Sequence, residues 1–143
     1  MFVKQLSVFI ENRKGRLEQV TEVLMQNKIN IISVSLADTN EYGLLRMIVS
    51  KPQEAKKALR ERGFSAMLTD VLAVKLTNEV AALQHLLKIL SDADLNVEYM
   101  YVLDSTKENG SMVVKVSDSE KALKAVNSGN IEVFNAEDAY SMH

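Results

Sequence analysis

The sequence predicts an α+β fold made of two successive βαββαβ units, and three observations lead to this prediction. The pattern of residues 1–69 recurs in residues 70–143. Segments with an apolar residue at every second position alternate with segments whose apolar residues recur every three or four positions, which are the periods of strands and helices. Turn-forming residues separate the two kinds of segment. We therefore expect two units, residues 1–69 and 70–143.

The repeat is visible as pairs of matched positions. The shift is 66 residues through the first half of each unit and 67 after a turn-rich segment, as if one hairpin had gained a residue. Such matching over a whole unit indicates a tandem duplication. The pairs at a shift of 66 include Asn12 with Asn78, Leu24 with Leu90 and Asn30 with Asn96, and the pair at 67 is Gly43 with Gly110.

The first half of each unit is predicted from local patterns. Residues 4–10 alternate as a half-buried strand does, and Leu17, Val20 and Leu24 then form one apolar stripe of a helix. Residues 31–36 and 44–49 alternate again, and the segment 38–43 between them is rich in turn formers. These two strands are therefore expected to form a hairpin.

The second helix of each unit is predicted to begin with a capping box. Ser50 is followed by Gln53, and Ser117 by Glu120, at the spacing that lets a hydroxyl and a later side chain satisfy each other's free amides. Pro52 would lie in the first turn, where its missing N–H costs nothing.

Glycines are predicted to end these second helices. Gly63 and Gly129 stand where left-handed C-caps are expected, and residues 64–68 and 131–135 read as the last strand of each unit. Right-handed crossovers fold each βαββαβ unit into the ferredoxin-like arrangement, a four-stranded antiparallel sheet with two helices on one face.

Composition excludes several classes of function. The chain has 143 residues and 47% apolar residues, enough for a packed core. Its net charge of −2 is unlike that of a nucleic-acid-binding protein, and no apolar run approaches the length of a membrane span. It has no cysteine and no pair of histidines at metal spacing, so we expect no metal, no cofactor and a cytoplasmic location.

Two short motifs, each placed in this element order, resemble the ACT domain, a family of small regulatory modules that bind amino acids. The first is a strand that ends at Asn12 and leads through Gly15 and Leu17 into a helix. The second is Asn30 with Ile31 at the start of the next strand, and Asn96 with Val97 repeat it. The resemblance covers the whole chain as two ACT-like units.

The resemblance implies a site for a free amino acid. Backbone N–H groups of the first loop would hold the ligand carboxylate at a helix N-terminus, and Gly15 would permit close approach. The side-chain amide of Asn30 would help to hold the ligand, and Asn96 with Val97 would complete the site where two units meet. The candidate ligand-binding residues are Glu11, Asn12, Arg13, Lys14, Gly15, Arg16, Leu17, Asn30, Ile31, Asn96 and Val97.

The chain departs from the family pattern in two places. Lys14 stands where many members have proline, and Ala81 stands in the second unit where the first has Gly15. We therefore expect one good site per chain, at the Gly15 loop. The residues that would form its wall are Ser33, Ser35 and Asp38, with one or more of Glu11, Tyr99 and Tyr101. This wall favours a polar or basic ligand side chain.

Simpler interpretations stand beside these. Gly15 can be a turn glycine, Asn30 and Asn96 can be C-caps or turn residues, and the two tyrosines can line a contact between units or chains. His85 is expected to be partly exposed on its helix.

The resemblance favours a non-enzymatic amino-acid sensor that acts as a homodimer. An RNA-binding module lacks support because the central strands carry no aromatic residues, and no catalytic constellation is visible. The alternative is a ligand-free interaction subunit that pairs with a partner enzyme.

Overall fold

The computed structural model describes residues 2–39, 41–77, 79–106 and 110–142. Contacts divide the chain into two compact units. The N-terminal unit consists of Lys4–Thr69 with Tyr140–His143, and the C-terminal unit consists of Met1–Val3 with Asp70–Ala139. Two positions used in the sequence analysis, Asn40 in the hairpin turn and Asn78 in the repeat, lie outside the described residues, as does the terminal His143.

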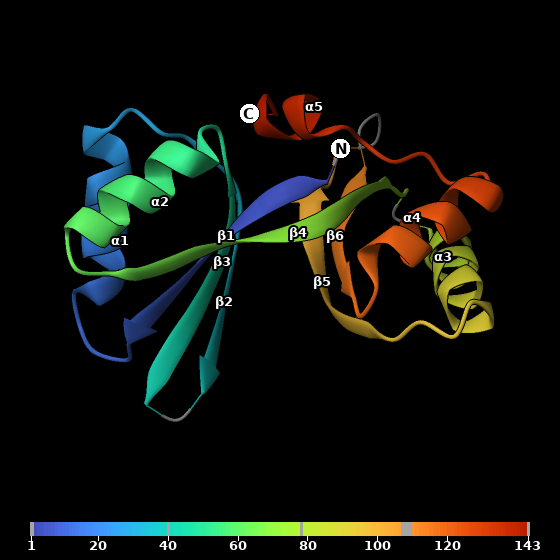
Figure 1. Ribbon diagram of the computed structural model, residues 1–143, viewed down its shortest axis with the longest axis horizontal. Coiled ribbons are helices and arrows are strands. Elements are labelled where there is room, and N and C mark those ends of the chain that lie inside the picture. Colours follow the sequence, from blue (N-terminus) through green and yellow to red (C-terminus); the bar gives the residue numbers. More distant parts are fainter. Residues whose placement is uncertain (1, 40, 78, 107–109, 143) are drawn as a thin grey trace. The chain divides into compact units, whose positions relative to one another are not determined.

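The N-terminal unit has the predicted βαββαβ order. Its elements are β1 (Val3–Glu11), α1 (Arg16–Gln26), β2 (Ile31–Thr39), β3 (Tyr42–Val49), α2 (Pro52–Glu61) and the first half of β4 (Ser65–Lys75). The strands lie in the order β2-β3-β1-β4, and β3 pairs antiparallel with both β1 and β2. Both helices cover one face of this sheet (Figure 1). The ferredoxin-like prediction is confirmed.

The C-terminal unit repeats this order with a reduced last strand. It contains the second half of β4, α3 (Val80–Asp92), β5 (Val97–Asp104), β6 (Ser111–Val116), α4 (Ser119–Ser128) and the short α5 (Ala136–Tyr140). The predicted strand at residues 131–135 is a single bridge between Val74 and Val133. Asn135 ends it early because its side-chain oxygen accepts the N–H of Asp138 at 2.9 Å and so starts α5.

Each unit has its own apolar core between its sheet and its helices. In the N-terminal unit, Leu6 and Met47 of the sheet pack with Val20, Leu24 and other buried residues of α1 and α2. In the C-terminal unit α3 supplies Leu86 and Leu90, packed with buried residues of β4, β6 and α4. The predicted stripe of α1 is confirmed at Val20 and Leu24, whereas its first member, Leu17, is 40% exposed.

All four long helices end in the same motif, a left-handed residue followed by a buried apolar one. The N–H of the apolar residue donates to the carbonyl five residues before it, as from Ile29 to Leu24 at 2.9 Å and from Leu95 to Leu90 at 2.9 Å. The same bond joins Phe64 to Leu59 and Ile131 to Val126, both at 3.0 Å. The left-handed residues are Lys28, Gly63, Asp94 and Asn130.

These left-handed residues correct one prediction and support the duplication. Gly63 has φ +87° as predicted, but Gly129 has φ −86°, and the left-handed residue of α4 is its neighbour Asn130. Lys28 and Asp94 are 66 residues apart, and Gly63 and Asn130 are 67 apart, the shifts found in the sequence. Neither Asn30 nor Asn96 has a positive φ, so the C-cap interpretation of these residues is wrong.

The predicted capping boxes are wrong, because other groups occupy the hydroxyls or the caps. The Ser50 hydroxyl accepts the N–H of Asn30 at 2.9 Å, and Lys51 becomes the N-cap of α2 without a side-chain hydrogen bond. In the C-terminal unit the cap of α4 is Asp118, whose carboxylate accepts the N–H of Lys121 at 3.1 Å. Pro52 does begin α2, as predicted.

Candidate functional site

The Gly15 loop joins β1 to α1 and needs a glycine for its conformation. Gly15 is the N-cap of α1 with φ +89°, a left-handed angle that residues with a side chain adopt at a cost. A Cβ built there would meet no heavy atom within 4 Å. Turn geometry is therefore one reason for this glycine, and the open space beside it leaves room for a ligand.

Several backbone N–H groups of this loop are available to a ligand. Asn12 donates to the carbonyl of Glu41 at 3.1 Å, and Arg16 donates weakly to that of Arg13 at 3.4 Å. Within the described residues, no hydrogen bond is observed from the N–H groups of Lys14, Gly15, Leu17 and Glu18. Free N–H groups at the start of an 11-residue helix, together with its dipole, favour a carboxylate.

A small cavity adjoins the loop. Its volume is about 110 Å³, and four of the predicted site residues line it: Glu11, Asn12, Arg13 and Leu17. We call it the N-unit cavity. It lies where β1 ends, α1 begins and the β2–β3 hairpin turns, so three elements distant in sequence contribute to it.

The other lining residues come from the strands. They are Ile10, Leu36, Asp38 and Gly43. Gly43 keeps the cavity open, since a Cβ there would lie 3.2 Å from side-chain carbons of both Ile10 and Leu36. Sequence reasoning named Asp38 as a wall residue and missed the other three. The sequence did contain a signal for these residues: Leu36 and Asp38 alternate along one strand, next to Gly43, which the repeat matches with Gly110.

The N-unit cavity carries both signs of charge. Arg13 Nε lies 3.0 Å from Glu11 Oε2, so these two side chains pair at the rim. The carboxylate of Asp38 has no observed partner among the described residues. A zwitterion is the kind of ligand that can pair with an acid and with N–H donors at once.

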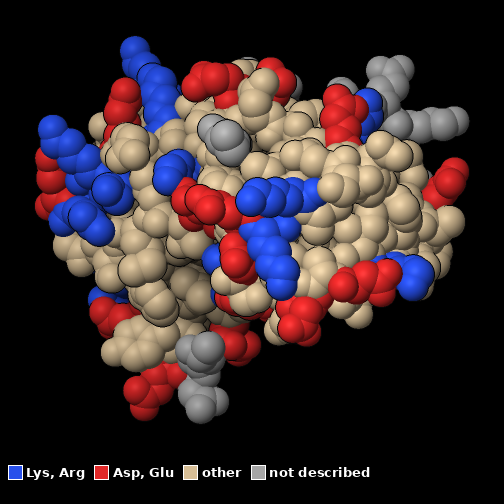
Figure 2. All heavy atoms as spheres, turned by 45° about the vertical axis from the view of Figure 1, so that its right-hand side comes forward, with Lys and Arg blue, Asp and Glu red and all other residues tan. Residues whose placement is uncertain are grey.

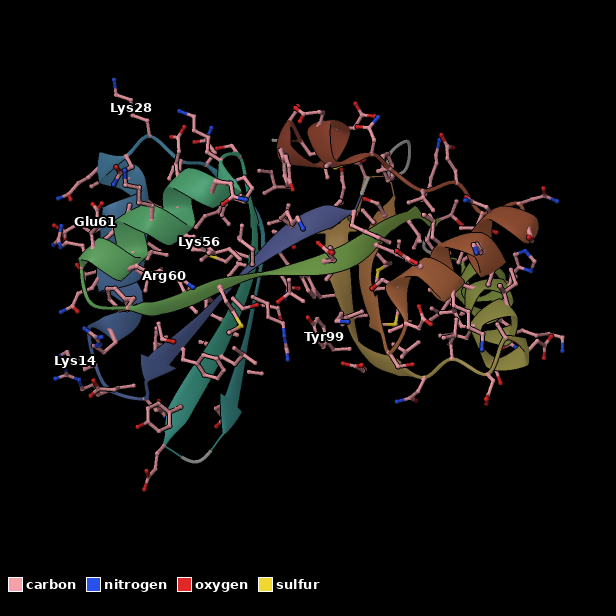
Figure 3. The ribbon with its side chains drawn as sticks, in the orientation of Figure 1. Lys14, Lys28, Lys56, Arg60, Glu61 and Tyr99 are labelled. Atoms are coloured by element: carbon pink, nitrogen blue, oxygen red, sulfur yellow. The ribbon has the colours of Figure 1, made fainter. Side chains whose placement is uncertain are left out.

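The remaining cations of the loop point elsewhere. The guanidinium of Arg16 lies 4.3 Å from the centre of the Phe64 ring, and its Nη1 donates to Gln19 at 2.6 Å. The Nε of Arg16 is buried and makes no hydrogen bond within the described residues. Lys14 extends outward from the loop (Figure 3). Arg16 therefore braces α1 against Phe64, and Lys14 does not line the cavity.

Asn30 and Ile31 lie at the far end of the same sheet. Ile31 pairs with Val49, whereas Glu11 pairs with Tyr42, seven positions away along β3. At the rise of a strand this is roughly 23 Å. The N-terminal unit therefore does not bring Asn30 to its own Gly15 loop. The side-chain amide of Asn30 is exposed and has no observed partner among the described residues.

Other predicted residues are placed as follows. Asn96 is exposed before β5, and Val97 opens that strand opposite Val116. Ser33 and Ser35 lie opposite Ile48 and Arg46, on the face of β2 away from Leu36 and Asp38. Tyr99, labelled in Figure 3, and Tyr101 share the corresponding face of β5. His85 is exposed, and its Nε2 lies 3.0 Å from the carbonyl of Gly129.

The chain matches the family model of an ACT domain pair over residues 1–143. The chain belongs to this family. It is 36% identical to protein BT0572 from Bacteroides thetaiotaomicron, whose crystal structure superposes with a TM-score of 0.92 over 99% of this chain and 97% of that one. No curated protein matches.

More distant structures share the fold of this ACT domain pair. The ligand-free regulatory subunit of aspartate kinase from Thermus thermophilus has a TM-score of 0.62 at 19% identity, over 90% of this chain and 94% of that one. The regulatory subunit from Thermus flavus has a TM-score of 0.60 at 18% identity, over 90% and 93%. The ACT domain pair is a family of regulatory domains, as the sequence resemblance predicted.

Two kinds of feature are absent from the described residues. No group of three or more His, Cys, Asp or Glu side chains is placed to hold a metal ion. Across the same residues, no helix combines the length and apolar character that crossing a membrane requires.

Proposed function

We propose that this ACT domain pair is a non-enzymatic regulatory sensor that binds a free amino acid at the Gly15 loop. The observation that carries the proposal is the set of N–H groups at the start of α1 that make no hydrogen bond among the described residues, beside a cavity whose Asp38 carboxylate also has no partner among them. The N–H groups of Gly15 and its neighbours hold the ligand carboxylate. Asp38 accepts the ammonium group or a basic side chain.

The size of the N-unit cavity sets a limit on the part of the ligand that it encloses. Its 110 Å³ is about four times the volume of a water molecule in the liquid. An α-amino carboxylate group fills such a space, and the ligand side chain then extends beyond it. Asn30 contributes its side-chain amide from another copy of the chain, because its own unit holds it at the opposite end of the sheet from its Gly15 loop.

Regulation follows from differential affinity. A ligand that binds one arrangement of units more tightly shifts the population toward that arrangement, and one that binds all arrangements equally shifts nothing. The proposal includes a cytoplasmic homodimer, in which a second copy supplies the missing Asn30 or Asn96. A regulated enzyme would respond to the resulting change in the arrangement of the units.

Thermal unfolding with each standard amino acid tests the proposal. An amino acid at about 100 times its Kd should stabilise the folded chain by about 2.7 kcal/mol, which raises Tm by several degrees. The test variant is Gly15→Asn, because asparagine tolerates a positive φ and its side chain would cover the loop N–H groups.

Gly63→Asn is the matched control. Gly63 has φ +87° against +89° for Gly15, and a Cβ at either position meets nothing within 4 Å. Both variants therefore carry the same backbone cost, but only Gly15→Asn should lose the ligand-induced shift. Asn30→Ala should weaken it. The proposal is refuted if no amino acid shifts Tm at millimolar concentration, or if both glycine variants respond like the parent.

The second candidate is a ligand-free interaction subunit, and one observation favours it. Val34 and Leu36 on the edge strand β2 are 54% and 52% exposed, a pair of apolar side chains next to unpaired strand backbone. Exposed edges of this kind pair with other chains. If no amino acid binds, this edge is the place to look for a partner.

A further inference from the structure

The C-terminal unit has a cavity at the position that corresponds to the N-unit cavity. It lies where β4 ends, α3 begins and the β5–β6 hairpin turns, and its volume is about 240 Å³. We call it the C-unit cavity. Leu76, Val102 and Asp104 line it, and a shift of 66 places them on Ile10, Leu36 and Asp38 of the N-unit cavity. The duplication has therefore kept a cavity in both units.

The sequence led us to expect the poorer site here, because Ala81 replaces the loop glycine. The structure gives the reason for the alanine. Helix α3 begins at Val80, so Ala81 lies inside the helix and no left-handed turn is needed, whereas α1 begins only after Gly15. The longer helix does not close the space, since this cavity is more than twice the volume of the other.

The two cavities differ in the charge of the residues that line them. Arg13 of the N-unit cavity is replaced by Glu79, Glu11 by Thr77, and Asp38 by Asp104. Glu79 and Asp104 thus give the C-unit cavity two carboxylates, and no Lys, Arg or His is among its described lining residues.

Charges elsewhere in the C-terminal unit also favour a cationic ligand. Residues 4–69 hold eleven Lys or Arg and seven Asp or Glu, whereas residues 70–143 hold six and twelve. The formal net charges are therefore +4 and −6, which together give the −2 of the whole chain. Figure 2 shows the interspersed acidic and basic side chains on one face. A strongly acidic unit raises the local concentration of cations.

Three of the described lysines of this unit make contacts away from the cavity. Lys75 lies 3.7 Å from the carboxylate of Glu132, Lys88 lies 3.4 Å from Asp92, and Lys115 donates to a backbone carbonyl at 3.0 Å. Glu79 makes no side-chain cap on α3. Its charge is therefore available to a ligand.

Apolar and hydroxyl groups complete the lining. Leu76, Val102 and Met112 offer an apolar surface for a short hydrocarbon stem. Ser111 also lines the cavity, and its buried hydroxyl makes no hydrogen bond within the described residues. Buried hydroxyls are almost always hydrogen-bonded, so this oxygen has unused capacity.

We propose that the C-unit cavity is a second ligand site, which takes a small molecule with an ammonium group on a short apolar stem and no carboxylate. Its volume equals that of about eight water molecules in the liquid, enough for an alkylamine of four or five carbons. This site is independent of the amino-acid site proposed above. One chain would then report on two ligands of different charge.

Titration calorimetry with butylammonium on the full chain tests this proposal. Butanol, of nearly the same shape without the charge, is the matched ligand control, and 2-aminopentanoate adds a carboxylate. We expect butylammonium to bind with an affinity that falls as salt is added, and both other compounds to bind at least about tenfold more weakly.

The test variants are Glu79→Gln and Asp104→Asn, which remove a charge and keep the shape. Asp104 accepts the N–H of Thr106 at 2.8 Å, and an asparagine oxygen can accept it too, so both variants should fold. Each should raise the Kd for butylammonium about tenfold or more, the usual effect of losing a charged hydrogen bond. Glu120→Gln, an exposed acid in the first turn of α4, should leave the Kd unchanged.

Three results would overturn the proposal. The first is no saturable binding of butylammonium up to about 10 mM, well above a Kd of 1 mM, which corresponds to about −4.1 kcal/mol. The second is equal binding of butanol or tighter binding of 2-aminopentanoate. The third is an equal loss in Glu120→Gln, which would mean attraction by the whole unit. Gly15→Asn should not change the binding of butylammonium. A failure of the amino-acid site and a failure of the amine site can therefore be told apart.

Discussion

Gly110 and Gly43 occupy matched positions in the two units, yet the structure predicts opposite tolerance to alanine. A Cβ on Gly110 would lie 2.7 Å from the backbone oxygen of Leu76. A Cβ on Gly43 would meet only side-chain carbons, at 3.2 Å. Side-chain ends can rotate away from such a contact, but the backbone oxygen of Leu76, directly after β4, cannot move without its neighbours.

The cost of Gly110→Ala can be worked from these contacts. The N–H of Leu76 donates to the carbonyl of Gly110 at 2.8 Å, so a shift that relieves the new contact also weakens this hydrogen bond. Overpacking costs about 1–3 kcal/mol and a lost hydrogen bond about 1 kcal/mol. We expect the free energy of unfolding to fall by about 2–4 kcal/mol, against less than about 1 kcal/mol for Gly43→Ala.

Urea unfolding of both variants, followed by circular dichroism, measures the difference. The midpoint should fall in Gly110→Ala with an unchanged m value, because stability changes and the surface exposed on unfolding does not. Equal effects of the two substitutions, or a neutral Gly110→Ala, would refute the argument that close backbone approach fixes glycine at this position.

Two further predictions concern single residues. Lys28→Gly should raise the free energy of unfolding by about 0.5–1 kcal/mol, because Lys28 pays for a φ of +56° that glycine adopts freely; chemical denaturation checks this, and a loss of stability would contradict it. Tyr140→Phe should lower it by about 1–3 kcal/mol, because the Tyr140 hydroxyl accepts the N–H of Lys4 at 2.7 Å and its removal leaves that donor without this partner; faster hydrogen exchange at Lys4 would confirm the mechanism, and an unchanged rate would contradict it.

Local patterns in the sequence determined the order of the elements and part of the buried face of the helices. Apolar periodicity gave the stripe that places Leu24 and Leu90 in the two cores, and the repeat gave the duplicated βαββαβ order. The Gly15 loop was found because a glycine before a helix is a local signal. These features depend on neighbouring residues along the chain, which is why a single sequence contains them.

The caps show where local reasoning fails. Ser50 and Gln53 have capping-box spacing, but the Ser50 hydroxyl accepts the N–H of Asn30, which is 20 residues away. Gly129 was expected to be left-handed and Asn130 is, because the helix ends one residue later than the glycine suggests. In the first case a group from another element decided between equally good local choices, and in the second the helix continued by one more residue.

Tertiary structure decided which residues line the two cavities. Pairing of the strands put Gly43 beside Ile10 and Leu36, and it placed Asn30 far from the loop with which the sequence had grouped it. It also gave the C-terminal unit the larger cavity, despite Ala81 in its first helix. The sequence by itself therefore determined the family and the elements. Which side chains share a cavity depended on strand register and on where each helix begins, because these bring together residues that are far apart in the chain.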